Sequence, residues 1–191
     1  MTIDSFVSKA EIMKTTITNP IFKDTVTFIE TCHKSKGNCT RLELTLFPGR
    51  GNPMHYHKTF HETFTSIEGE LTIKGKNGSR VLKPGQSYTV KPFELHCFCN
   101  TSNAEIKFSI TIEPGSTGFE NFLRIGYGLA EDGLTNAKSM PKKFQHTAVL
   151  MCMSDTNVPG IFKLFNPLFR RAYKQAQKSG EEQRLIDKYC V

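Results

Sequence analysis

Residues 20–113 form a series of short segments that alternate or favour β-branched and aromatic residues, separated by glycine, proline and asparagine. In order, they read RLELTLF, ETFTSI, ELTIKG, SYTVK, HCFCN and EIKFSITIE. Strands at such regular spacing are typical of an antiparallel sandwich or barrel. Asn77-Gly78 and Pro84-Gly85 supply the turn residues that such a fold requires. The pattern therefore predicts a mainly β body.

After Pro114-Gly115 the spacing of apolar residues becomes helical. Apolar residues recur at steps of three and four after a Thr117-x-x-Glu120 capping box, and Asp132-Gly133 ends this first helix. Pro141 is placed to open a second helix. A third helix is predicted from residue 166 to about residue 180, and a short fourth helix follows it.

These patterns predict a β-barrel with a C-terminal α-helical extension. The N-terminal segment, residues 1–39, is expected to contribute strands that pack on the barrel or on a dimer partner. The barrel is expected over residues 40–115, and the helical extension, residues 116–191, is expected to pack on it. At 191 residues the chain fits one domain with an appendage and can bury a substantial core.

The chain has 38% hydrophobic and 23% charged residues, values typical of a globular protein. No apolar run approaches the roughly 20 residues that span a bilayer. The N-terminus lacks the basic start and apolar centre of a signal peptide. We therefore expect a cytoplasmic protein without a membrane partner. The six cysteines show no CxxC spacing and are expected to be reduced thiols.

The net charge of +7 is concentrated near the C-terminus. Residues 138–191 hold ten Lys/Arg against four Asp/Glu, which gives +6, whereas residues 51–137 hold eight against nine, which gives −1. A nucleic-acid-binding protein would carry its positive charge on the central body together with a recognition motif, so no nucleic-acid partner is expected. The segment IFKLFNPLFRRAYKQAQK resembles a membrane-surface helix in composition. Such a helix more often packs its apolar face on its own domain, and we expect that arrangement.

Residues 49–69, GRGNPMHYHKTFHETFTSIEG, contain three of the six histidines and a glutamate. His55 and His57 point to the same side of an extended chain because side chains alternate along a strand. Glu62 lies five residues beyond His57, so a turn can return its carboxylate to the side of the two imidazoles. His96, in the predicted strand HCFCN, offers a fourth ligand. Imidazole and carboxylate groups together are typical of a site for a divalent transition metal.

The spacing of these residues resembles that of the cupin superfamily. Its first motif, G-x5-HxH-x3,4-E-x6-G, is filled by Gly49, His55, His57, Glu62 and Gly69. The motif tolerates three residues before the acidic position, so His61 competes with Glu62 for it. The six-residue gap to Gly69 and the alternation of strand side chains favour Glu62.

The second cupin motif, G-x5-PxG-x2-H-x3-N, is met by Gly85, His96 and Asn100. Its centre differs, because Lys91 stands at the proline position and Phe93 at the second glycine position. This departure leaves the histidine in place, and we expect it to alter the loop before His96 and to add bulk at the pocket mouth.

The resemblance covers residues 40–112 and implies a double-stranded β-helix, which is a short jelly-roll barrel. It also implies a single metal held by three histidines and one glutamate, which in this chain are His55, His57, Glu62 and His96. The expected metal is one of Fe, Mn, Ni, Cu or Zn. Inward-facing residues of the same strands are expected to line the pocket, namely Phe64, Phe98 and Asn100. Cys97 and Cys99 are expected to face the other way and to pack outside the lumen.

The superfamily includes dioxygenases, decarboxylases, isomerases and storage proteins, so the fold implies no reaction. We expect the metal centre to bind a small organic molecule, with an oxygenase as the first candidate. Its metal would bind a substrate oxygen and activate the substrate toward dioxygen, and Glu62 would double as a base if it partly leaves the metal. The alternatives are a metal-dependent isomerase or epimerase, for which no separate base is evident, and a non-catalytic ligand-binding module. Homodimers are common among cupin-like proteins, so a homodimer is expected.

Overall fold

The computed structural model describes residues 14–190 of the chain. The first thirteen residues, which include most of the stretch inspected for a signal peptide and part of the predicted 1–39 segment, lie outside this range. The strands are β1 (Thr16–Thr18), β2 (Thr25–Glu30), β3 (Thr40–Leu46), β4 (His61–Glu68), β5 (Leu71–Gly75), β6 (Gly78–Leu82), β7 (Ser87–Val90), β8 (His96–Cys99) and β9 (Ile106–Glu113). The helices are α1 (Thr117–Glu131), α2 (Phe144–Met153), a 3-10 helix (Gly160–Phe165), α3 (Asn166–Lys178) and α4 (Glu181–Tyr189).

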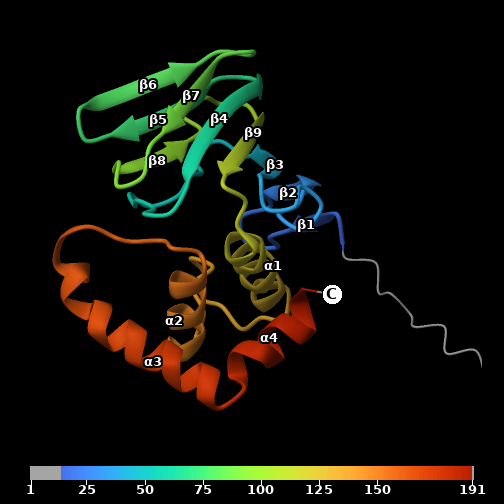
Figure 1. Ribbon diagram of the computed structural model, residues 1–191. Coiled ribbons are helices and arrows are strands. Elements are labelled where there is room, and N and C mark those ends of the chain that lie inside the picture. The colour runs from blue at the N-terminus through green and yellow to red at the C-terminus, as the bar shows by residue number, and fades with distance from the viewer. Residues whose placement is uncertain (1–13, 191) are drawn as a thin grey trace, which may run out of the picture.

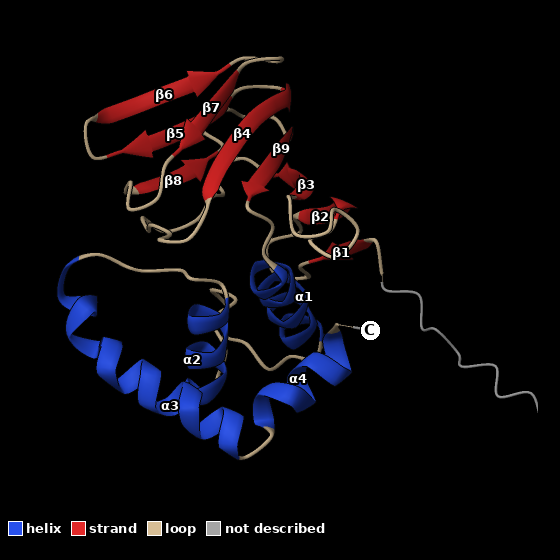
Figure 2. Ribbon diagram, viewed as in Figure 1, coloured by secondary structure: helices blue, strands red, loops and turns tan. Residues whose placement is uncertain are grey.

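The strands form two antiparallel sheets. One sheet has the order β1-β2-β3-β9-β4-β7, and the other has the order β6-β5-β8. Neighbours such as β3 and β9 lie far apart in the sequence, as the crossing connections of a jelly roll require. The chain thus forms a mainly β jelly-roll barrel with a C-terminal helical extension, as the sequence predicted, and Figures 1 and 2 show the strands and the helices as two groups.

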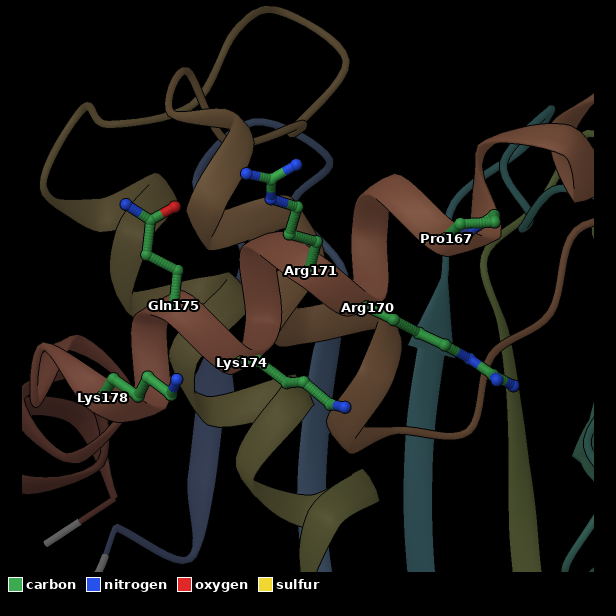
Figure 3. Close-up of a pocket in the computed structure, with 6 residues that line it drawn as sticks. All are labelled: Pro167, Arg170, Arg171, Lys174, Gln175 and Lys178. Atoms are coloured by element: carbon green, nitrogen blue, oxygen red, sulfur yellow. The ribbon is translucent and has the colours of Figure 1, made fainter.

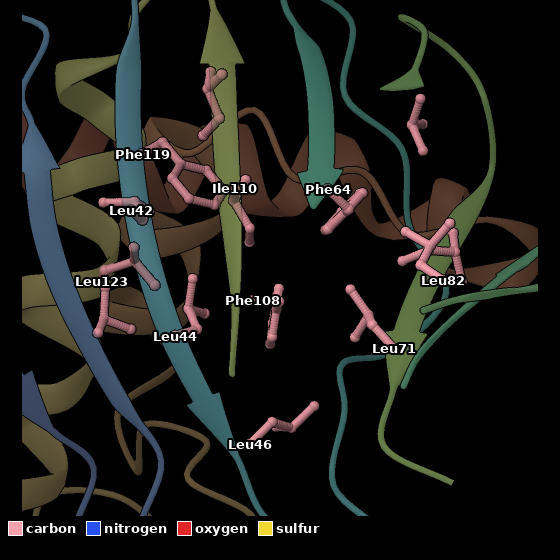
Figure 4. Packing of buried hydrophobic residues seen from close by; sticks show 14 of the residues in the cluster. Leu42, Leu44, Leu46, Phe64, Leu71, Leu82, Phe108, Ile110, Phe119 and Leu123 are labelled. Atoms are coloured by element: carbon pink, nitrogen blue, oxygen red, sulfur yellow. The ribbon is translucent and has the colours of Figure 1, made fainter. Parts of the chain in front are cut away.

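The barrel core is built from alternate residues of the long strands. On β3, Leu42, Leu44 and Leu46 are buried, and they pair in register with Ile110, Phe108 and Ile106 of β9. Figure 4 shows Leu42, Leu44 and Leu46 with Phe108 and Ile110 among the strands of the barrel. Each buried side chain of this size contributes about 1.5–3 kcal/mol relative to an exposed one, so the alternation fixes the register of the pair.

Helix α1 joins the barrel to the remaining helices. Phe119 and Leu123 belong to the barrel core, whereas Ile125 and Leu129 belong to a second core shared with α2, α3 and α4. Phe122 packs against both cores. The helical extension is therefore attached to the barrel through apolar contacts along one helix.

The start of α1 differs from the predicted capping box. Ser116, not Thr117, is the N-cap residue, and its side chain accepts a hydrogen bond from the backbone N–H of Phe119. The buried Glu120 carboxylate does not reach back to the cap. Its Oε1 accepts a hydrogen bond from the backbone N–H of Cys32 at 2.6 Å and another from the Thr40 hydroxyl at 2.6 Å. The Glu120 carboxylate therefore binds two donors outside the helix instead of the N-terminal backbone of its own helix.

The second helix begins at Phe144 rather than at Pro141, because Pro141 forms an isolated β-bridge with Thr135. The predicted third and fourth helices are confirmed as α3 and α4. Helix α3 places Ala176 and Tyr173 in the helical core, as expected for this segment, but Leu164, Phe165 and Leu168 nearer its start are exposed, so its apolar residues pack on the domain only in part. None of the helices in residues 14–190 is long and apolar enough to cross a membrane.

The outer side of α3 carries a surface pocket of about 560 Å³. Cations dominate its lining, which consists of Pro167, Arg170, Arg171, Lys174, Gln175 and Lys178. Figure 3 shows these side chains on the exposed turns of the helix. None of these lining residues is a histidine, a cysteine or a carboxylate, so the pocket offers no group that typically binds a transition metal.

Candidate metal centre

Three separate segments bring the four predicted ligands together. His55 and His57 lie in the connection before β4, where His55 forms an antiparallel bridge with His96, the first residue of β8. Glu62 is the second residue of β4. All four side chains are buried, and their exposed fractions are 6% for His55, 2% for His57, 3% for Glu62 and 1% for His96.

The distances among the ligand atoms match those expected around one ion. The Nε2 atoms of His55 and His57 are 3.1 Å apart, and the Nε2 atoms of His57 and His96 lie 3.6 and 2.9 Å from Glu62 Oε2. Two ligand atoms at about 2.1 Å from one metal, at right angles, are about 3.0 Å apart. One ligand atom from each of the four residues falls within 4.8 Å of all the others. The residues therefore fit a single metal ion.

The number of protons that His55 and His57 can carry is also consistent with a bound cation. His55 Nδ1 lies 2.8 Å from the Pro53 carbonyl oxygen, His57 Nδ1 lies 3.2 Å from the Asp155 carbonyl oxygen, and the two Nε2 atoms face each other. Two neutral imidazoles carry two N–H protons, but these three contacts need three. When both protons lie on the Nδ1 atoms, two nitrogen lone pairs face each other, and a positive ion between them removes the repulsion.

The electrostatic environment favours a cation bound by neutral imidazoles and an ionised carboxylate. Burial lowers the pKa of His55 to about 4 and also lowers the pKa of His57, in both cases against the attraction of Glu62. Burial raises the pKa of the Glu62 carboxyl, but the hydrogen bond from His96 and the three imidazoles outweigh it, so this pKa is lower than usual. Burial lowers the pKa of His96, but the hydrogen bond to Glu62 and its charge outweigh that effect and raise it. A proton on His96 thus neutralises Glu62 when no metal does so.

His57 is enclosed by residues from both parts of the molecule. The Phe60 ring stacks on its imidazole with centroids 4.4 Å apart, and the Phe119 ring of α1 approaches edge-on at 5.9 Å. The Asp155 carbonyl, in the loop after α2, lies beside Nδ1. Local sequence patterns do not predict the last two neighbours, because Phe119 and Asp155 lie far from the histidine segment in the sequence.

The altered second motif places Phe93 in the loop before β8, and His96 still lies in the cluster. Phe93 occupies the position where the cupin motif has glycine, and it adopts a left-handed backbone conformation with φ 66°. This conformation costs a bulky residue roughly 1–2 kcal/mol. The Phe93 backbone N–H donates a hydrogen bond to the His57 carbonyl at 2.7 Å, and its largely exposed ring stacks on Tyr56 at 6.4 Å.

The remaining predicted residues lie around the cluster in different ways. Phe64 is fully buried and places its ring against His96, with centroids 5.9 Å apart, and Phe98 packs against Phe64 at 5.8 Å. Asn100 is buried, but its amide donates to the carbonyls of Leu46 and Ala104, so its polar atoms hold the turn after β8. Cys97 and Cys99 remain free thiols.

A cavity of about 240 Å³ lies beside the β5–β6 hairpin. His96 is the cluster residue that contributes to its lining, and Tyr88 and Glu94 lie in the same cavity. The Tyr88 hydroxyl donates a hydrogen bond to Glu94 Oε1 at 2.8 Å. This cavity therefore joins one candidate ligand to a neighbouring pair of proton-exchanging groups.

The antiparallel strands form a jelly roll, and three imidazoles and one carboxylate lie together inside it. The protein therefore has a β-barrel with a candidate metal centre. Comparison with known families identifies it further: residues 42–113 match the family described as Cupin domain. The match covers most of the β-barrel and includes all four residues of the cluster. No curated protein matches the sequence.

Several solved structures resemble part of this chain at low sequence identity. The sugar phosphate isomerase of the cupin superfamily from Silicibacter pomeroyi is 20% identical over 47% of this chain and 59% of its own, with a TM-score of 0.41. The present chain thus spans less than two thirds of that protein. A predicted oxalate decarboxylase from Thermotoga maritima is 18% identical over 48% of this chain and 80% of its own, with a TM-score of 0.46. The Cupin_2 domain of an XRE family transcriptional regulator from Enterobacter cloacae is 21% identical over 47% and 95%, with a TM-score of 0.43.

Proposed function

We propose that the protein is a metal-dependent oxygenase that acts on a small organic molecule. The observation that supports this proposal is the convergence of three imidazole Nε2 atoms and one carboxylate oxygen at a buried point inside the barrel. The proposed ligands are His55, His57, Glu62 and His96. A divalent transition metal at this point would supply a Lewis acid for a substrate oxygen and, if it is redox-active, a centre that exchanges electrons with dioxygen.

The residues of the chain would orient the reaction and exclude water. Each histidine directs Nε2 inward because its Nδ1 lies beside a backbone carbonyl. The Glu62 charge offsets part of a divalent charge, and this carboxylate is the proposed proton acceptor when a substrate hydroxyl binds. Phe64 beside His96 and Phe60 over His57 make the surroundings apolar. An apolar, water-poor lining suits oxidation of an organic substrate better than hydrolysis.

Oxygen consumption by metal-loaded protein tests the proposal. Protein purified without chelators or nickel affinity resin would be analysed for metal, then loaded separately with Fe, Mn, Ni, Cu or Zn. We expect oxygen uptake by at least one redox-active form with a phenolic, diketone or thiol substrate, and none by His96→Ala. Absence of uptake with every metal and substrate class would contradict the oxygenase. Thermal stabilisation by a panel compound without turnover would instead indicate a ligand-binding module.

A proton-shifting isomerase is a second candidate because the structure supplies acid–base groups beside His96. Tyr88 and Glu94 share its cavity and are hydrogen-bonded to each other. The hydrogen bond to Glu94, followed by burial, raises the pKa of Tyr88, so its hydroxyl keeps its proton at neutral pH. In this reading Glu94 accepts a substrate proton while a metal polarises the adjacent carbonyl.

Anaerobic assays separate the two candidates. The isomerase predicts interconversion of sugar or keto–enol isomers under nitrogen and a loss of at least about tenfold in kcat for Glu94→Gln, since general acid–base catalysis contributes about 10²–10⁴-fold. Activity that requires dioxygen and is unchanged in Glu94→Gln would exclude the isomerase.

A further inference from the structure

The three histidines of the cluster are oriented by hydrogen bonds to backbone carbonyls, but the carbonyls come from different places. His55 Nδ1 contacts the Pro53 carbonyl at 2.8 Å, and His96 Nδ1 contacts the Glu94 carbonyl at 3.0 Å. In both cases the acceptor lies two residues earlier on the same segment. His57 has no such local acceptor among the described contacts. Its Nδ1 contacts the carbonyl of Asp155, which lies 98 residues later, in the helical extension.

The Asp155 side chain ties its loop to the histidine segment. Its Oδ2 atom accepts hydrogen bonds from the backbone N–H of Lys58 at 2.6 Å, the backbone N–H of Thr59 at 3.0 Å and the Thr59 hydroxyl at 3.0 Å. Two residues on, Asn157 and Tyr56 exchange backbone hydrogen bonds of 3.0 Å each. The loop therefore pairs with the chain on both sides of His57.

The conformation of Asp155 directs its carbonyl at the imidazole. Its φ is 50°, a left-handed conformation that aspartate tolerates better than most residues. The Asn157 amide donates to the same carbonyl at 2.7 Å, which holds this oxygen in place while leaving its second lone pair for His57. The Asn157 amide also donates to Asp155 Oδ1 at 3.0 Å, so five hydrogen bonds besides the His57 contact hold Asp155 in its left-handed conformation.

We propose that Asp155 is a positioning residue of the metal centre, supplied by the helical extension. It holds His57 as the tautomer with the proton on Nδ1, so that the Nε2 lone pair faces the cluster. This inference rests on the proposed metal centre. The inference gives the helical extension a role at the proposed metal centre, because the His57 imidazole is oriented only when the loop after α2 packs against the histidine segment.

Metal titration of three single variants tests the proposal. Asp155→Ala removes the three hydrogen bonds to residues 58 and 59, whereas Asp155→Asn keeps an acceptor oxygen and a residue type suited to positive φ. Asp132→Ala is the matched control, because it removes an aspartate of the same extension that binds Lys188 and Tyr189 instead. The Zn²⁺ dissociation constant would be measured with a competing chelator, and the Co²⁺ absorption spectrum would report the ligand geometry.

When a metal-bound histidine loses the hydrogen-bond partner of its other ring nitrogen, metal binding typically weakens 10–100-fold. We expect about that increase in the Zn²⁺ dissociation constant for Asp155→Ala together with a changed Co²⁺ spectrum, a smaller increase for Asp155→Asn, and no change for Asp132→Ala. In the metal-free protein, ring-nitrogen NMR should find the His57 proton on Nδ1 in the wild type and distributed over both nitrogens in Asp155→Ala.

The possible failures are distinguishable. Unchanged Zn²⁺ binding and an unchanged tautomer in Asp155→Ala would overturn the positioning role and leave the metal centre intact. Equal weakening in Asp155→Ala and Asp132→Ala would also overturn it, because the effect would then reflect general stability. A wild-type protein that binds no metal, with His57 protonated on Nε2, would overturn the proposed function and this inference together.

Discussion

Glu62 and His61 are adjacent in the chain, and their side chains lie on opposite faces of strand β4. Glu62 is buried in the cluster, whereas His61 is exposed, with its Nδ1 near the Glu113 carbonyl at 3.3 Å. Alternation along β4 decides between two residues that both have metal-binding chemistry. Whether a residue can join the proposed metal site thus depends on the face of the sheet that its side chain occupies as well as on its donor atom.

This difference predicts the outcome of two histidine substitutions. His96→Ala removes a proposed ligand, so we expect metal affinity to fall by more than roughly 100-fold, beyond the 10–100-fold typical of a lost outer partner. His61→Ala removes an exposed imidazole from the neighbouring strand and should leave affinity unchanged. Isothermal titration with Zn²⁺ measures both. Equal affinities in the two variants would mean that the cluster does not bind the metal.

Sequence spacing was sufficient to predict which side chains would meet. The HxH pair, Glu62 and His96 sit at intervals that two strands and a turn convert into one cluster, and the structure brings them together. Sequence spacing was not sufficient to predict which other residues would surround these side chains. Asp155 reaches His57 through a fold-dependent contact between distant segments, and Asn100 uses its amide to hold a turn. Neither property follows from local spacing.

At the scale of the element, α1 is the part of the chain that both cores share. Its glycines differ in what surrounds them. A Cβ added at Gly118 would lie 2.1 Å from the Met153 carbonyl oxygen, whereas one added at Gly126 would meet only a Leu150 methyl group at 3.9 Å. The backbones of α1 and the end of α2 therefore touch at Gly118, immediately before the loop that holds Asp155.

Two glycine-to-alanine substitutions in α1 should have opposite effects on stability. Gly118→Ala forces the end of α2 away from α1 and should lower the free energy of unfolding by about 1–3 kcal/mol. Gly126→Ala has space for its methyl group and should raise this free energy by up to about 1 kcal/mol, because alanine loses less backbone freedom in a helix. Urea unfolding measures both. A stabilising Gly118→Ala would contradict the close contact between the helices.

Local pattern predicted the number and order of these helices better than their ends. The first helix was expected from a Thr117 cap, but Ser116 takes that position, and Glu120 serves two donors from the N-terminal part of the sheet. The second helix was expected at Pro141, which instead pairs with Thr135. Helix ends depend on which distant groups compete for the terminal hydrogen bonds, and a single sequence does not contain that information.

At the scale of the whole molecule, the edge of the larger sheet offers a surface for a second copy. β1 is the outermost strand of that sheet, and Ile29 on the neighbouring β2 is 42% exposed. Within residues 14–190, the outer side of β1 has no strand partner, and an open edge beside an exposed apolar side chain is suited to pairing between chains. The homodimer expected from the resemblance to cupins is therefore proposed to form at β1 and β2.

Gel filtration checks this dimer. The wild type should elute near twice the monomer mass of 21.6 kDa. Ile29→Asp should shift it toward the monomer, because a charge in the interface must lose its hydration. Val81→Asp, which changes an equally exposed apolar residue on β6 of the other sheet, should leave the mass unchanged. A wild type that elutes as a monomer would exclude the dimer at the concentration used.

Coupling between the two cores predicts how the metal affects unfolding. Phe122 packs on both cores, and the Asp155 loop joins the helices to the metal segment, so barrel and helices should unfold together. A metal present at 100 times its dissociation constant stabilises the folded state by about 2.7 kcal/mol. For a chain of this size that corresponds to a rise in Tm of roughly 5–10 °C.

Far-ultraviolet circular dichroism during heating tests this coupling, because its helical signal comes from α1 to α4 and not from the metal site itself. We expect one transition that moves upward with Zn²⁺ in the wild type and does not move in His96→Ala. The helical signal should shift as far as the NMR ring signals of Tyr88, a residue of barrel strand β7, followed during the same heating. If the helices melted at the same temperature with and without metal while the barrel shifted, they would be an independent unit, and the extension would have no energetic connection to the site.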